Sequence, residues 1–161
     1  MYTLECEFDH ASVHCRDIRR IFEDPYNLAK ITPPWLSFRI LTPDLKMRKG
    51  LEIDYRLRLF GIPLRWKTEI TSYEPPIYFV DEARHSPYKY WCHHHTFRET
   101  SAGAVIEDRV EYDLPLGPLG RAAHSLVSLQ LHTIFAYRQR AILTLLGEQA
   151  IELRPPRIRR S

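Results

Sequence analysis

Segments in which apolar and polar residues alternate, joined by short turns, fill most of the sequence from residue 51 to residue 113. In the first of them, Ile53, Tyr55 and Leu57 alternate with charged residues. Side chains at every second position of a β-strand point to the same face, so this alternation predicts strands with one apolar and one polar face. Strands joined by turns of a few residues pair antiparallel, because a parallel connection needs a dozen or more residues. The sequence therefore predicts an antiparallel sheet with one buried face.

Other expected elements flank this region. A strand at residues 2–8 and two short helices, near residues 18–22 and 26–30, precede it, and a strand at residues 37–42 leads into it. A long helix at residues 118–147 follows, and it is the only expected element large enough to cover the apolar face of the sheet. The apolar residues that we assign to the covering arc of this helix are Leu119, Ala123, Leu126, Val127, Ile134, Tyr137, Ala141 and Leu145.

This order of elements predicts an α+β helix-grip fold. A curved antiparallel sheet of about seven strands would wrap around the long C-terminal helix, in the order of one strand, two short helices, six strands and the helix. A chain of 161 residues is the size of one ordinary domain. We expect that domain at residues 1–148 and a basic, flexible tail at residues 149–161.

Composition excludes several classes of protein. Cys6, Cys15 and Cys92 form no CxxC pair, so neither a disulfide framework nor a zinc knuckle is favoured. The formal net charge is +3, and four arginines lie among the last eight residues, which contain no acid. The rest of the chain is therefore nearly neutral, which argues against nucleic-acid binding. No apolar run approaches the ~18 residues that span a bilayer. We expect a cytoplasmic protein without a membrane span.

Two of the expected strands carry unusual residues at every second position. One set is Trp91, His93, His95 and Phe97, and the other is Asp108, Val110 and Tyr112. Each set shares a face of its strand, and a short connection makes the two strands neighbours. Imidazoles and a carboxylate beside large aromatic rings are unusual on a buried face that only packs apolar side chains. The mixture predicts a pocket with a polar floor.

We expect this pocket to hold a ligand between the sheet and the long helix. Gln130 and Thr133 are assigned to it because an unpaired buried amide costs ~1–3 kcal/mol. The residues expected to bind the ligand are Tyr55, Trp66, Asp81, Trp91, His93, His95, Asp108, Tyr112, Gln130, Thr133 and Tyr137.

Three interpretations of His93 and His95 stay open at this stage. They could bind a metal with Asp81 or Asp108 as a third ligand, contact an organic ligand, or pair with a carboxylate in a polar core. We expect no metal and no other cofactor, because the sequence places no third ligand firmly and the aromatic neighbours suggest stacking walls. A histidine–carboxylate pair is also a simple proton shuttle, so a catalytic role stays open.

The expected order of one strand, two short helices, six strands and a long helix resembles that of the START-like superfamily, also called SRPBCC. The chain also contains the short motifs Gly61-Ile62-Pro63, Phe79-Val80-Asp81-Glu82, Pro87-Tyr88 and the two sets of alternating residues. These motifs are similar to those of a bacterial branch of stand-alone proteins in the superfamily, related to polyketide cyclase-like proteins and to domains labelled "cell division inhibitor". Arg84-His85-Ser86 departs from that pattern at the rim of the expected pocket.

The resemblance implies a cavity for a hydrophobic or amphipathic molecule, lipid-like or polycyclic aromatic, and no shared set of catalytic residues. Two functions follow as hypotheses. The first is a binding or carrier protein, and the second is an enzyme of the cyclase or dehydratase type that uses His93 or His95 with Asp108. Two partner arrangements are also open, a homodimer and docking to an epimerase-like domain.

Overall fold

The computed structural model describes residues 1–11, 13–147 and 153–160. The elements, in chain order, are β1 (Tyr2–Ala11), α1 (Cys15–Glu23), α2 (Asn27–Ile31), the short 3₁₀ helix η1 (Pro34–Leu36), β2 (Arg39–Ile40), β3 (Glu52–Leu59), β4 (Ile62–Glu74), β5 (Tyr78–His85), β6 (Tyr90–Thr100), β7 (Gly103–Asp113), α3 (Pro118–Leu145) and β8 (Arg157–Arg160).

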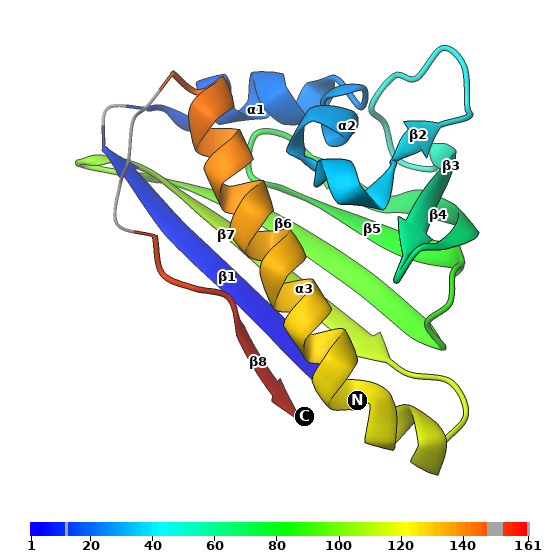
Figure 1. Ribbon diagram of the computed structural model, residues 1–161. Helices are drawn as coiled ribbons and strands as arrows, with labels where there is room; N and C mark the ends of the chain where they lie inside the picture. Colours follow the sequence, from blue (N-terminus) through cyan, green and yellow to red (C-terminus); the bar gives the residue numbers. More distant parts are fainter. Residues whose placement is uncertain (12, 148–152, 161) are drawn as a thin grey trace.

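Among the described residues, all eight strands belong to one antiparallel sheet in the order β2-β3-β4-β5-β6-β7-β1-β8. The long helix α3 runs diagonally across one face of this sheet, and α1 and α2 lie beside its C-terminal end (Figure 1). The predicted α+β helix-grip fold is therefore confirmed. Among the described residues, no helix combines the length and the apolar character needed to cross a membrane.

The C-terminal segment differs from the expected flexible tail. Residues 157–160 form β8, which pairs with residues 2–5 of β1, so the sheet has eight strands where about seven were expected. Arg159 forms an ion pair with Glu5, and the buried side chain of Gln139 on α3 donates a hydrogen bond to the carbonyl oxygen of Arg154. These contacts fix a segment whose prolines and arginines resemble a tail. Residues 149–152, also assigned to the tail, lie outside the described residues.

The buried face of α3 also differs from the expected arc. Leu119, Leu126 and Leu145 of that arc are exposed to solvent, as is Leu129. The helix buries instead Gly120, Leu131, Phe135, Arg138, Gln139, Ile142 and Leu143. Apolar residues stand on every side of this helix, so hydrophobicity alone does not select the buried face. The face that α3 buries also makes polar contacts. Arg138 contacts Asp108 of the sheet, and Gln139 contacts the C-terminal segment at Arg154.

Candidate functional site

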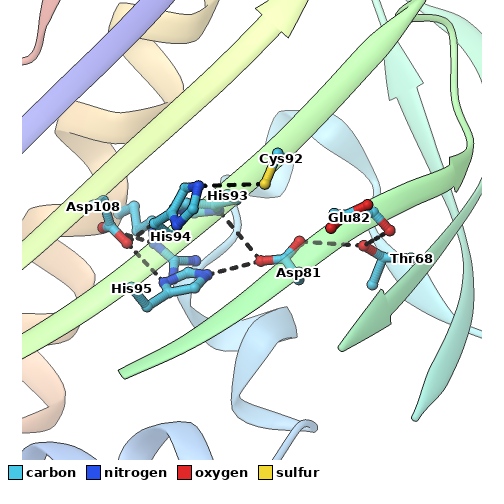
Figure 2. Close-up of polar contacts among 9 residues, drawn as sticks. Thr68, Asp81, Glu82, Cys92, His93, His94, His95 and Asp108 are labelled. Carbon is cyan, nitrogen blue, oxygen red and sulfur yellow. Dashed lines mark hydrogen bonds and ion pairs between the residues drawn. The ribbon is translucent and has the colours of Figure 1, made fainter. Parts of the chain in front are cut away.

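Three neighbouring strands bring four ionisable side chains to the same face of the sheet. Asp81 on β5 is paired with His93 on β6, and His95 on β6 is paired with Asp108 on β7. Side chains of directly opposed residues project to the same side of an antiparallel sheet. Figure 2 shows Asp81, His95 and Asp108 in a connected row across these strands. The strand parity seen in the sequence thus brings His93, His95 and Asp108 together, with Asp81 added by the register.

Each imidazole lies between the two carboxylates. His95 Nε2 is 2.8 Å from Asp81 Oδ2, and His95 Nδ1 is 2.8 Å from Asp108 Oδ1. His93 is close to only one of the two carboxylates. Its Nε2 is 3.0 Å from Asp108 Oδ1, whereas its Nδ1 is 3.6 Å from Asp81 Oδ2. The two rings are tilted by 38° to each other, with 3.7 Å between their centroids. His95 therefore has a close carboxylate oxygen at both ring nitrogens, and His93 has one at a single nitrogen.

Arg138 completes this group from α3, the helix that faces the sheet. Its Nε is 3.3 Å from Asp108 Oδ2, and its guanidinium lies 5.6 Å from the centre of the Phe22 ring on α1. Asp108 and Arg138 are almost inaccessible to solvent, and Phe79 stacks on His95 at a centroid distance of 4.0 Å. We call Asp81, His93, His95, Asp108 and Arg138 the ionisable cluster.

Both carboxylates of the ionisable cluster stay ionised in the fold. Burial raises the pKa of Asp108, but the charge of Arg138 and the hydrogen bonds from both imidazoles outweigh burial and hold that pKa well below its ordinary value. Burial likewise raises the pKa of Asp81, and the hydrogen bond from His95 with the charges around it bring the net pKa below normal. Burial and the neighbouring His95 lower the pKa of His93 to about 4, so His93 is neutral near pH 7.

Arg138 offsets one of the two buried negative charges of the ionisable cluster. Its guanidinium lies beside Asp108, and it also helps to lower the pKa of Asp81. Both ring nitrogens of His95 lie 2.8 Å from a carboxylate oxygen, so this imidazole connects the two carboxylates.

The ionisable cluster borders a cavity of about 180 Å³ between the sheet, the short helices and α3. Six of the residues predicted to bind a ligand line it, namely Tyr55, Trp66, Asp81, Trp91, His93 and His95. Most of the other lining side chains are apolar, among them Ile53, Ile70, Phe79 and Phe135. The arrangement combines a mainly apolar chamber with a few polar groups on one wall, as in typical sites for small molecules.

Five predicted site residues do not line this cavity. Asp108 lies behind the imidazoles and reaches the cavity only through them. Tyr112 is fully buried, and its hydroxyl is 3.1 Å from His124 Nε2. Thr133 is exposed and donates its hydroxyl hydrogen to the Leu129 carbonyl, and Tyr137 packs against Trp35. Gln130 is half-buried outside the lining. The assignments on α3 fail because the helix presents another face to the sheet.

The prediction missed several lining residues, of which Arg138 matters most. Thr68, Phe79 and Tyr88 also line the cavity. Arg138 follows Leu131 by seven residues and Phe135 by three, which places it on their side of a helix. A single arginine on an apolar helical face was the signal for a buried partner of the carboxylates.

Asp81, His93 and His95 are also the candidate metal ligands. One donor atom from each lies within 4.8 Å of the others, and two imidazoles with one carboxylate suit zinc or iron. Asp108 is hydrogen-bonded to His93 Nε2 and lies 2.8 Å from His95 Nδ1, on the side of both rings away from Asp81, where carboxylates lie behind metal-bound histidines. However, Arg138 Nη2 is 3.4 Å from His95 Nδ1, and this fixed positive charge opposes a second cation.

The fold has many solved counterparts, although no known family model and no curated protein matches the sequence. A protein from Chromobacterium violaceum is similar with a TM-score of 0.69 and 16% identity, over 92% of this chain and 100% of that chain. A protein from Mycobacterium smegmatis is similar with a TM-score of 0.63 and 21% identity, over 90% of this chain and 89% of that chain. Ara h 8.0201 is similar with a TM-score of 0.60 and 13% identity, over 89% of this chain and 99% of that chain. At these identities the likeness shows the helix-grip fold alone.

Proposed function

We propose that this protein binds and carries a hydrophobic or amphipathic small molecule in the cavity between the sheet and α3. The observation that carries the proposal is a mainly apolar cavity of about 180 Å³ with the ionisable cluster on its wall. An apolar cavity of ~150 Å³ already admits benzene, so the chamber has room for a small ring system. The apolar lining provides affinity, and the cluster orients the polar end of the ligand.

The proposal extends to membership of the START-like superfamily, in its branch of stand-alone bacterial proteins. Its support is the helix-grip fold together with the motifs around Phe79, Trp91 and Asp108. Native mass spectrometry of the purified protein is the direct test. We expect a bound hydrophobic molecule that is released on denaturation, and its mass would identify the class of ligand. Failure to bind any member of a broad panel of neutral hydrophobic probes would contradict the carrier proposal.

Trp91 tests whether the cavity binds ligand or is only part of the core. Trp91→Ala should weaken binding of the neutral fluorescent probe N-phenyl-1-naphthylamine about tenfold, because the indole lines the cavity and is half-buried. The free energy of unfolding should fall by less than the ~3–5 kcal/mol of a fully buried tryptophan. Trp35→Ala is the matched control, since Trp35 is exposed outside the cavity lining. A large loss of stability with unchanged probe affinity would favour a core role.

A second candidate function is an enzyme of the cyclase or dehydratase type in the same cavity. It is favoured by one observation, the contact of His95 with two carboxylates next to the cavity, because such a pair can move a proton. Metal analysis separates both functions from a metalloenzyme. Protein purified without an affinity tag should contain no stoichiometric zinc or iron, whereas metal that is lost on His95→Ala would put a metalloenzyme first.

A further inference from the structure

The indole of Trp66 stands out among the polar groups that line the cavity. Trp66 is only 5% exposed, and no group among the described residues accepts a hydrogen bond from its Nε1. It is the one buried side-chain donor or acceptor without a partner in the part of the chain that the structure describes. A buried donor left without an acceptor is costly, and most tryptophans bond their N–H when buried. A bound molecule that supplies an acceptor for the Trp66 N–H would remove this cost.

The surroundings of Trp66 restrict what that acceptor belongs to. Tyr55 stacks nearly parallel to the indole with 6.1 Å between ring centroids, and the Trp91 ring is perpendicular to the indole at 5.3 Å. Tyr88 packs on both tryptophans. We call Tyr55, Trp66, Tyr88 and Trp91 the aromatic wall. Its rings suit a flat molecule, because rings gain most from stacked and edge-to-face contacts. The ring face of Trp91 is itself only a weak acceptor for an N–H.

The aromatic wall adjoins the ionisable cluster at Thr68. Trp66 and Thr68 are two residues apart on β4 and so share a face, and Thr68 Oγ1 is 3.2 Å from Asp81 Oδ1. Most of the remaining lining is apolar, so a ligand with a net charge would be costly to bury there. A neutral molecule that lies along the wall can reach both the free N–H of Trp66 and the carboxylate of Asp81.

We propose that the ligand is a neutral, flat ring compound with an acceptor oxygen, such as a ketone or ether oxygen, that receives the Trp66 Nε1 hydrogen bond. This inference rests on the carrier function and adds the chemical class of the ligand. Trp66 is then the residue that selects an oxygenated ring compound over the hydrocarbon of the same shape. Selectivity of this kind comes from a buried polar group that a hydrocarbon leaves unpaired.

A matched pair of probes tests the inference. Indane and 1-indanone share a fused ring skeleton and differ by one carbonyl group. Their dissociation constants are measured by displacement of N-phenyl-1-naphthylamine from wild-type protein, Trp66→Phe and Trp91→Phe. We expect wild type to prefer 1-indanone, and Trp66→Phe to reduce its preference about threefold to tenfold. Trp91→Phe removes an indole from the same wall and should weaken both probes while keeping their ratio.

The wild-type protein allows a second test of whether the ligand oxygen accepts the Trp66 hydrogen bond, without a substitution in the aromatic wall. The three tryptophans give three indole N–H signals in a proton–nitrogen NMR spectrum. We expect 1-indanone to move the Trp66 signal downfield and indane to leave it near its position, as a new hydrogen bond to the carbonyl requires.

The outcomes separate the inference from the function on which it rests. An unchanged preference in Trp66→Phe, with no downfield shift of the Trp66 signal, overturns the inference and leaves the carrier function standing as long as indane binds. If neither probe displaces N-phenyl-1-naphthylamine and that probe itself does not bind, the carrier function fails and the inference fails with it.

Discussion

At the scale of single residues, the ionisable cluster depends on Arg138 for its charge balance. Arg138 Nε is 3.3 Å from Asp108 Oδ2, and both side chains are buried. Arg138→Met should lower the free energy of unfolding by about 3–5 kcal/mol near pH 7, because a buried carboxylate loses its partner. The double variant Arg138→Met/Asp108→Asn should recover a large part of that loss in urea unfolding. Equal stability of the single and double variants would show that the pair is not coupled.

His93 makes stability depend on pH. Its pKa is lowered from 6.5 to about 4 by burial and by His95, so the unfolded chain takes up a proton before the folded one does as the pH falls. Stability should therefore decline from about pH 6.5 to pH 4, by at most roughly 3 kcal/mol. The pKa values of Asp81 and Asp108 are also lowered in the fold, so protonation of these two carboxylates reduces stability further at still lower pH.

Urea unfolding between pH 7 and pH 4 checks this expectation. His93→Gln removes the titrating ring, so its stability should change less over this range than that of the wild type. A wild-type stability that is flat from pH 6.5 to pH 4, or that rises on acidification, would contradict a neutral, buried His93.

At the scale of elements, α3 offers a test of which face it buries. Leu131 is 3% exposed and Leu129 is 66% exposed, so two leucines only two residues apart lie on opposite faces of the helix. Leu131→Ala should cost about 2–5 kcal/mol of unfolding free energy, and Leu129→Ala should stay within about 0.5 kcal/mol. Similar losses for both variants would support the arc that hydrophobic spacing predicts.

Strands were easier to predict from the sequence than the helix face. The period of two in β6 and β7 identifies which side chains share a face, and short connections make these strands neighbours. Strand parity alone was therefore enough to bring His93, His95 and Asp108 together. On α3, apolar residues on all sides leave the rotation of the helix undetermined, so Gln130, Thr133 and Tyr137 were wrongly placed in the cavity and Arg138 was missed.

At the scale of the whole molecule, the order and lengths of the elements were enough to predict the helix-grip fold. Each strand before α3 lies next to its chain neighbour or, in the case of β1, next to β7. Asp81 was among the predicted site residues, but its contacts with both imidazoles depend on strand register. The free Trp66 N–H depends on the packing of four rings, and neither feature follows from spacing along the chain. The strand β8 was missed because its pairing with β1 joins opposite ends of the sequence.

That pairing has a consequence for how copies of the protein behave together. With β8 in place, the backbone of residues 2–5 is hydrogen-bonded within the molecule. Without it, the same backbone groups form an open sheet edge, which is a template for pairing with another chain. Deletion of residues 154–161 should therefore cause concentration-dependent aggregation, measured by light scattering.

A charge-matched variant shows whether the strand or its arginines keep the copies apart. Arg154→Ser/Arg157→Ser/Arg159→Ser/Arg160→Ser removes the same four positive charges as the deletion and leaves the backbone of β8 able to pair. If this variant stays monodisperse while the deletion aggregates, the last strand is a built-in guard against self-assembly. Aggregation of both to the same extent would mean that charge repulsion provides the protection.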